Sequence, residues 1–169
     1  YEKYYKRSSI IVMSYFVVLT GIVVNPIQIG CEVIYKNELV KNIYEISKED
    51  DGLWFVEGNY PLINVPIMVG APTINCTNVY PDLDKWRLVD TEEKYVDVYN
   101  RYAHINAELT DEPTEFVEGI TPDTFEIRLN FEDLKILNVK YLLSQNDYTD
   151  REEAGIEKIS QVGNFYIYQ

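Results

Sequence analysis

The chain opens with its longest apolar run. Residues 8–31 contain no charged side chain, and residues 10–24 are mostly apolar. Lys3, Lys6 and Arg7 precede this run, opposed by one acid. Cations followed by about 20 apolar residues are typical of a helix that enters a bilayer from its cytoplasmic side. We therefore predict a transmembrane helix with a basic flank in residues 1–25, lipid bilayer contact through residues 8–24, and an extracytoplasmic domain in residues 26–169.

Two other interpretations of the apolar run remain open. Its many Ile and Val residues favour strands, so a buried hairpin is one alternative. A secretory signal is the other, although neither an initiator Met nor a small-residue cleavage site supports it. Asn25-Pro26 would end a helix, because proline cannot continue the helical hydrogen-bond pattern.

Beyond residue 30 the spacing of apolar positions changes repeatedly between helical and alternating. Helical spacing predicts helices over residues 32–49, 90–102 and 131–138. Alternation or short apolar runs predict strands over residues 53–56, 105–109, 125–129 and 139–144. Gly163-Asn164 predicts a two-residue hairpin between strands at 156–162 and 165–168. Helices that interleave with strands favour an α/β domain with a mixed sheet, and α+β is the alternative.

Residues 59–84 follow neither period and are rich in Pro, Asn, Gly and Thr, which predicts a long, shaped loop. Loops of this length inside compact domains are often functional. Sugars are held by hydrogen bonds to their hydroxyls and by stacking on aromatic faces, so this composition suits a carbohydrate. It also suits an ordinary ordered loop. The ligand candidates are Asn75, Thr77, Asn78, Tyr80 and the nearby Trp86.

A second cluster of candidate ligand-binding residues follows the predicted helix at 90–102. Its members are Tyr99, Asn100, Arg101 and His104. Arg101 could bind a phosphate or a carboxylate through two parallel hydrogen bonds. We favour the alternative, in which the tyrosines pack in the core and Arg101 pairs with one of the many acids.

Charge narrows the possible partners. Lys and Arg total 15 and Asp and Glu total 28, which gives a net charge of −13. The first seven residues contribute +2, so the remainder carries −15. Such a domain repels nucleic acid and anionic headgroups, and we predict no nucleic-acid partner. Cys31 and Cys76 are too few for a disulfide framework; one disulfide or two free thiols both remain open.

No motif in the sequence specifies catalysis. His104 is the only histidine, and no Gly-x-Ser-x-Gly or Gly-x-Gly-x-x-Gly motif occurs, so we predict no catalytic residue and no cofactor. Asp82 and Asp84 have the Asp-x-Asp spacing that can hold a divalent cation. Acidic chains produce such pairs by chance, so Asp82 and Asp84 are only weak metal candidates and a solvated loop is the favoured interpretation.

Four stretches together resemble a known class of protein. They are VNPIQIG at 24–30, APTINCTNVY at 71–80, YNRYAHI at 99–105 and LNVKYLL at 137–143. As a set they resemble the C-terminal region of bacterial polytopic membrane proteins of the YfhO type. More distantly, they are similar to the GT-C class of lipid-linked sugar glycosyltransferases.

The resemblance implies a location and a function. The parent protein would sit in the bacterial cell membrane and transfer a sugar from a polyprenyl-phosphate carrier to a cell-envelope glycan. In that class the acidic catalytic residues lie near the N-terminal membrane helices. This chain would then be a non-catalytic extracytoplasmic domain that contacts carbohydrate or lipid-linked sugar and the remainder of the parent. Two alternatives are a glycan-binding or protein-binding assembly module without transferase activity, and a self-contained soluble enzyme.

Overall fold

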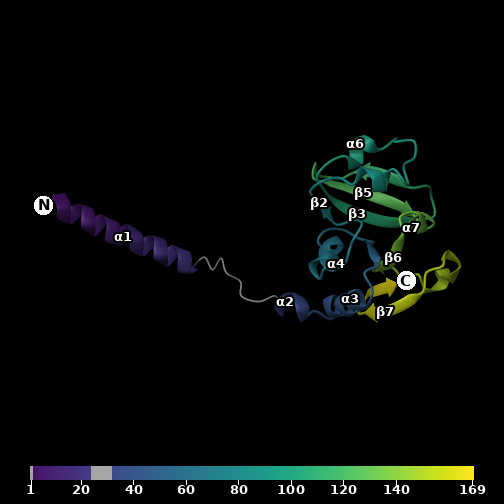
Figure 1. Ribbon diagram of the computed structural model, residues 1–169, viewed down its shortest axis with the longest axis horizontal. Coiled ribbons are helices and arrows are strands. Elements are labelled where there is room, and N and C mark those ends of the chain that lie inside the picture. Colours follow the sequence, from purple (N-terminus) through teal and green to yellow (C-terminus); the bar gives the residue numbers. More distant parts are fainter. Residues whose placement is uncertain (1, 24–31) are drawn as a thin grey trace. The chain divides into compact units, whose positions relative to one another are not determined.

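The computed structural model describes residues 2–23 and 32–169 of the chain, which divide into two compact units (Figure 1). One unit lies within residues 1–33, and the other comprises Ile34–Gln169. The predicted boundary at residues 25 and 26, the predicted stop at Asn25-Pro26 and Cys31 lie outside the described residues.

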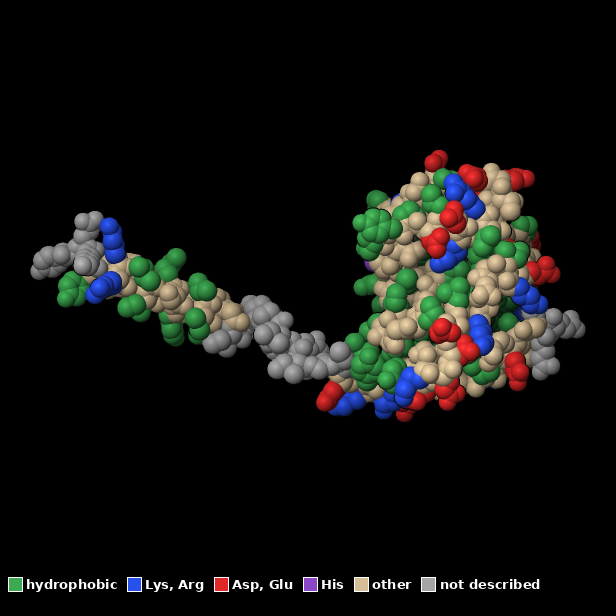
Figure 2. Space-filling model, viewed as in Figure 1, with side chains coloured by type: hydrophobic (Ala, Val, Ile, Leu, Met, Phe, Trp, Pro, Cys, Tyr) green, Lys and Arg blue, Asp and Glu red, His purple; other side chains and the backbone are tan. Residues whose placement is uncertain are grey.

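The apolar run forms a helix, α1 (Glu2–Val23), rather than the alternative buried hairpin. Thr20 is accommodated in α1 because its hydroxyl donates to the Phe16 carbonyl at 2.8 Å. The large apolar side chains from residue 10 to residue 19 are exposed, and Figure 2 shows them along α1 with cations near its N-terminal end. Within residues 2–23 and 32–169, no helix is both long enough and apolar enough to cross a membrane, so the structure does not support the predicted transmembrane helix.

The second unit is a mixed α/β domain, as predicted, but it contains two four-stranded mixed sheets. Its helices are α3 (Glu38–Glu49), η1 (Leu62–Asn64), α4 (Val65–Met68), α5 (Leu83–Trp86), α6 (Val96–Tyr99), α7 (Asp133–Ile136) and η2 (Thr149–Ala154). The short helix α2 (Glu32–Tyr35) spans the boundary between the two units. Its strands are β1 (Leu53–Val56), β2 (Thr77–Asn78), β3 (Ala103–Thr110), β4 (Glu115–Glu118), β5 (Thr124–Asn130), β6 (Val139–Ser144), β7 (Lys158–Val162) and β8 (Phe165–Tyr168).

Sheet A has the strand order β1-β6-β8-β7. β1 is parallel to β6, and β8 is antiparallel to both β6 and β7. The β7–β8 connection is the predicted hairpin. Trp54 stacks on Tyr141 with ring centroids 4.9 Å apart, and both rings pack with Leu39 and Ile43 of α3 in one apolar cluster. α3 begins where the Asn37 side chain accepts hydrogen bonds from the Leu39 and Val40 amides, so the predicted helix over 32–49 is interrupted.

Sheet B has the strand order β2-β3-β5-β4, with β3 parallel to β5. Alternate residues of β3 and β5 are buried, and they form the larger core cluster with residues of α5 and α6. Trp86 meets Phe116 edge to face at 5.5 Å in that cluster. The intervening residues of β3, His104, Asn106 and Glu108, point away from the core and form the outer face of sheet B.

The two sheets meet immediately after β1. The Gly58 amide donates to the Ala107 carbonyl at 2.8 Å, and the Ala107 amide donates back at 3.0 Å. Gly58 has a φ of +141°, a conformation that side chains disfavour, so glycine suits this position. This pair joins the end of β1 to the middle of β3.

Asn75 makes a second link between β1 and β3. Its Oδ1 accepts from the Val56 amide at 2.9 Å, while its Nδ2 donates to the carbonyls of Val56 at 2.7 Å and Ile105 at 3.4 Å. The side chain is fully buried. The amide therefore replaces a neighbouring strand at this edge of β1.

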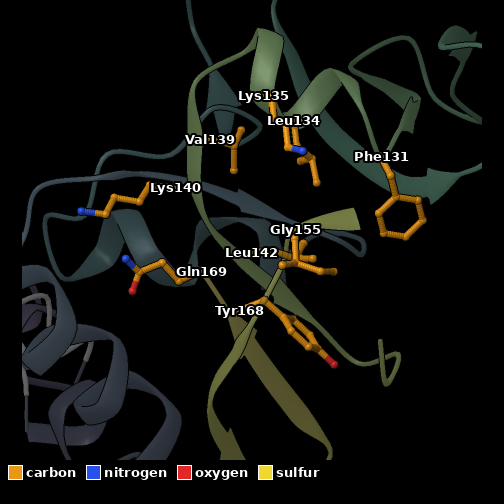
Figure 3. Close-up of a pocket in the computed structure, with 10 residues that line it drawn as sticks. Phe131, Leu134, Lys135, Val139, Lys140, Leu142, Gly155, Tyr168 and Gln169 are labelled. Carbon is orange, nitrogen blue, oxygen red and sulfur yellow. The ribbon is translucent and has the colours of Figure 1, made fainter. Parts of the chain in front are cut away.

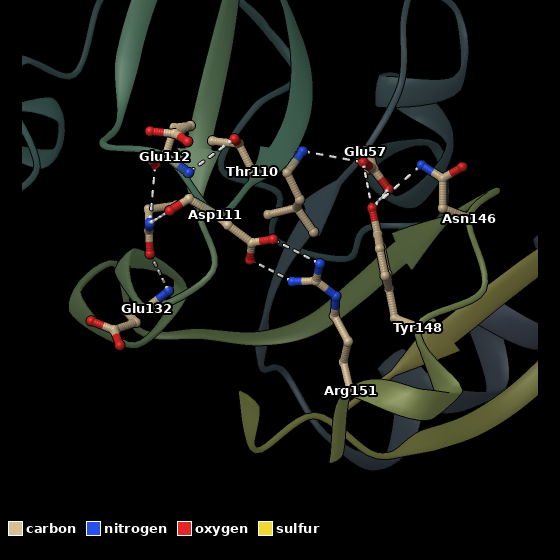
Figure 4. Close-up of polar contacts among 10 residues, drawn as sticks. Glu57, Thr110, Asp111, Glu112, Glu132, Asn146, Tyr148 and Arg151 are labelled. Atoms are coloured by element: carbon tan, nitrogen blue, oxygen red, sulfur yellow. Dashed lines mark hydrogen bonds and ion pairs between the residues drawn. The ribbon is translucent and has the colours of Figure 1, made fainter. Parts of the chain in front are cut away.

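Glu57, a residue only 6% exposed, makes the third link through its carboxylate (Figure 4). Its oxygens accept from the Leu109 amide at 3.1 Å, from the Tyr148 hydroxyl at 2.8 and 3.0 Å, and from the Ser144 hydroxyl. Burial and the neighbouring Glu57 raise the pKa of Tyr148, which keeps its hydroxyl a donor. Glu57 thus connects β3, β6 and the segment before η2.

An ion pair between Arg151 and Asp111 also holds the segment around η2. The Arg151 guanidinium donates from Nη1 to Oδ1 and from Nη2 to Oδ2 of Asp111, the second contact being 2.8 Å (Figure 4). These two hydrogen bonds hold the pKa of the Asp111 carboxyl below its ordinary value. The same guanidinium lies over the Phe131 ring at 4.6 Å.

We expect Asn75→Ala to lower the free energy of unfolding of the domain by about 3 kcal/mol, because each buried backbone group left without a partner costs about 1–3 kcal/mol. Urea denaturation of the full chain, followed by tryptophan fluorescence, measures this loss. Asn100→Ala, at an exposed asparagine, is the control and should change stability by less than about 0.5 kcal/mol. Equal stability of the two variants would contradict the structural role of Asn75.

Candidate functional site

The structure places three of the predicted ligand-binding residues inside the domain. Asn75 links two strands, and the side chains of Trp86 and Tyr99 are 0% and 1% exposed in the core. Apolar packing of α5 and α6 against sheet B explains the position of both rings. This burial corrects the prediction for these residues, because no ligand at the surface can reach them.

Arg101 is engaged within the domain, as the favoured alternative predicts. Its Nη2 donates to the Asp97 carbonyl at 2.8 Å and to the Glu118 carboxylate at 3.2 Å. Asn100 next to it is exposed. A guanidinium that already binds a carboxylate is not a free site for a phosphate.

The Asp-x-Asp pair has a local structural role. Asp82 caps α5 by accepting from the Lys85 amide at 3.3 Å, and Asp84 pairs with Arg87 at 3.5 Å. Among the residues that the structure describes, no group of three or more His, Cys, Asp or Glu side chains could hold a metal ion. Asp82 and Asp84 therefore remain what the sequence favours, part of a solvated surface turn.

The remaining candidates, Thr77, Asn78 and His104, lie at the edge of sheet B. Thr77 and Asn78 form β2. Thr77 pairs with His104 of β3, and Asn78 pairs with Ala103. The Thr77 hydroxyl lies 2.7 Å from Nδ1 of His104. Tyr80 follows β2 with its ring exposed to solvent.

A side chain from η1 fixes the Thr77 hydroxyl. Asn64 accepts from the Thr77 amide at 3.0 Å through Oδ1 and donates to the Thr77 hydroxyl at 2.9 Å through Nδ2. The Thr77 hydroxyl therefore bridges an amide and an imidazole. This arrangement holds the His104 ring in one orientation at the sheet edge.

Two tyrosines flank His104. The ring centroids of Tyr60 and Tyr102 lie 4.8 and 5.8 Å from that of His104, and the two tyrosines are 58% and 47% exposed. The Tyr60 amide donates to Oδ1 of Asn106 at 3.0 Å, so the segment after Gly58 lies beside the outer face of β3. We call these six residues the His104 platform: Tyr60, Asn64, Thr77, Tyr102, His104 and Asn106.

The His104 platform combines exposed aromatic rings with amide, hydroxyl and imidazole groups. Its six members carry no carboxylate, guanidinium or ammonium group. Such a surface can stack on the apolar face of a ligand and exchange hydrogen bonds with its hydroxyls.

Three members of the platform, Tyr60, Asn64 and Asn106, were not predicted from the sequence, whereas Tyr102 lies within the predicted cluster at residues 99–104. Tyr60 and Asn64 belong to another segment, and only the fold brings them to His104 and Thr77. The alternation along β3 does place Asn106 on the same face as His104, which is the one signal that could have found it.

A small cavity lies elsewhere in the domain. It has a volume of about 60 Å³ and lies between α7, β6, β8 and residues 155–156 (Figure 3). Phe131, Leu134, Leu142 and Tyr168 line it, and Lys140 at its rim pairs with Asp50. Ligand pockets usually measure about 300–1,000 Å³, so this cavity is a packing defect rather than a binding site.

One protein family matches most of the chain. The family is described as a domain of unknown function (DUF7654), and its match covers residues 33–169. These are the residues of the second unit, Ile34–Gln169, and one more. Neither the curated proteins nor the solved structures contain a match to the chain. The resemblance to YfhO-type proteins stays a prediction.

The position of Tyr99 has a consequence for stability at alkaline pH. Burial, and then the negative charge of Asp90, raise the pKa of Tyr99 from 10.0 to about 12. The unfolded chain therefore loses this proton at lower pH than the folded chain does, and stability falls as pH rises from 10 to about 12. We expect the stability of the Tyr99→Phe variant to fall less steeply over this pH range when urea denaturation is measured at several pH values. Tyr80→Phe, at an exposed ring, is the control, and an unchanged slope for Tyr99→Phe would refute the assignment.

Proposed function

The chain belongs to the DUF7654 family. We propose that it is a non-catalytic domain that binds carbohydrate of the bacterial cell envelope at a membrane. The observation that supports the proposal best is the His104 platform. Tyr60, Tyr102 and His104 present ring faces, and the neighbouring amide and hydroxyl groups point to the same edge of sheet B. A sugar ring has the complementary surface, an apolar face bordered by hydroxyls.

The charge of the domain favours the sugar part of a ligand over any phosphate. The chain carries −13, and Arg101, close in sequence to the platform, is bound to Glu118. A phosphate would meet neither a free guanidinium beside these rings nor an attractive field. In this proposal the domain binds glycan hydroxyls, and the rest of the parent protein binds the lipid carrier.

The proposed parent follows from the resemblance stated above. It is a polyprenyl-phosphate-sugar-dependent glycosyltransferase of the bacterial cell membrane, and its catalytic residues belong to other parts of that protein. The domain would hold the growing or accepting envelope glycan near the transfer site. No residue of this chain is proposed to take part in bond making.

α1 supports the membrane location in this proposal. Its apolar side chains are exposed, including Ile11, Phe16 and Val17, while Lys6 and Arg7 lie near its N-terminus. Exposed apolar surface of this extent is costly in water and favourable in lipid hydrocarbon. Cations next to an apolar helix match the anionic headgroups of a cytoplasmic leaflet.

We expect Tyr60→Ala and His104→Ala each to weaken carbohydrate binding about two- to tenfold, because a stacked aromatic pair contributes about 0.5–1.5 kcal/mol beyond its buried area. The measurement uses the full chain in detergent against an array of neutral glucose, galactose, mannose and N-acetylhexosamine oligosaccharides. Tyr35→Ala, at an exposed tyrosine of α2, is the matched control and should bind like wild type. Absence of binding by the wild-type chain to every sugar would overturn the proposed function.

We expect the full chain to sediment with phosphatidylglycerol-containing liposomes, and the double variant Ile11→Lys/Val17→Lys to remain in the supernatant. The reason is that each apolar side chain buried in lipid contributes about 1.5–3 kcal/mol. Ile136→Lys replaces an exposed apolar residue of the second unit and is the control that should still sediment. Sedimentation of the double variant to the wild-type extent would show that α1 does not carry the membrane contact.

A further inference from the structure

We propose that the ligand is an uncharged chain of several sugars that lies along β3 on the outer face of sheet B, rather than a single sugar at the His104 platform. This inference rests on the proposed function and extends it from the kind of ligand to its length and charge. Three features of the outer face carry it: its length, the polar side chains that β3 and β5 turn outward, and the pairing of its charges.

The outer face continues the His104 platform along the strand. His104, Asn106, Glu108 and Thr110 are alternate residues of β3, and such residues share one face of a sheet. Six residues of strand extend about 20 Å, which exceeds the length of one sugar ring. A ligand that stacks on Tyr60 can therefore reach further polar groups only if it is a chain.

The parallel pairing of β3 with β5 makes this polar surface two strands wide. His104, Asn106 and Glu108 lie opposite Thr124, Glu126 and Arg128. The alternate residues Phe125, Ile127 and Leu129 are buried in the core, so the outward residues of β5 are polar or charged. Beyond Glu108, the face meets a hollow of about 410 Å³ lined by Thr110, Glu115 and Arg128 among others.

The charges of the outer face are paired with one another. The Arg128 guanidinium contacts Glu115 at 2.8 Å, Glu126 at 3.0 Å and Glu108 at 3.9 Å. Three carboxylates on one cation leave no positive group there for an anionic chain, and the surplus negative charge repels it. An uncharged polymer meets no such penalty.

The same surface has hydrogen-bonding capacity for hydroxyls. Asn106 uses Oδ1 to accept from the Tyr60 amide, and no described residue accepts from its Nδ2. Glu108 and Glu126 supply acceptor oxygens within reach of the same face. A protein partner would need an apolar patch to exclude water, and β3 and β5 turn only polar side chains outward.

The test measures how the affinity of the full protein chain in detergent depends on the length and charge of the sugar chain. The method is isothermal titration calorimetry. The neutral probes are chitobiose with chitohexaose and cellobiose with cellohexaose. We expect at least one hexamer to bind about tenfold more tightly than its dimer. The charged probe is hexagalacturonate, which is expected to bind more weakly than that neutral hexamer because the face carries surplus negative charge.

Variants test where the sugar chain lies on sheet B. Glu108→Gln and Glu126→Gln should each reduce the gain from dimer to hexamer and leave dimer binding unchanged, because they lie beyond the stacking rings. Glu45→Ala, at an exposed glutamate of α3, is the control and should keep the full gain. Thermal unfolding midpoints equal to wild type show that each variant is folded, and the two variants are tested independently.

The outcomes separate this inference from the proposed function. Equal affinity for dimer and hexamer, or tighter binding of hexagalacturonate than of the neutral hexamer, overturns the inference while the platform proposal stands. A full gain in both Glu108→Gln and Glu126→Gln overturns the placement along β3. Failure of every sugar to bind overturns the proposed function and the inference with it.

Discussion

The arrangement of the two sheets depends on the buried carboxylate of Glu57. An ionised carboxylate removed from water is costly unless donors surround it. Here a backbone amide of β3, a hydroxyl from β6 and the phenol of Tyr148 supply those donors, so one side chain joins both sheets. Because Tyr60 follows three residues later, the same junction also sets where its ring meets His104.

Local pattern was sufficient for most of the strands. Alternation identified β3 and β5, a short apolar run identified β1, and Gly163-Asn164 identified the β7–β8 hairpin, since period and turn chemistry are properties of adjacent residues. The predicted helix over 90–102 shrank to the single turn α6. The buried Asp90 carboxylate accepts from the Lys94 and Tyr95 amides and so holds the chain in a turn before α6.

Long-range contacts explain what the sequence could not reveal about the candidate site. Asn75 has the composition of a ligand-binding residue, yet its partners Val56 and Ile105 are distant in sequence, and only the fold shows that its amide is already used. The platform has the same origin, because Tyr60 and Thr77 approach His104 from separate segments. Amide-rich loops serve folding and binding with the same groups, so composition alone cannot assign the role.

The parallel pairing of β1 with β6 has a consequence for how the chain reaches this structure. Val56 lies opposite Leu143, and all of sheet B is encoded between the two strands. Pairings so distant in sequence form slowly, because a long segment must first be ordered or closed into a loop. During synthesis on the ribosome, Trp54 and Phe55 therefore remain without their strand partner until β6 has emerged, and in that interval their apolar surface is open to association with other chains.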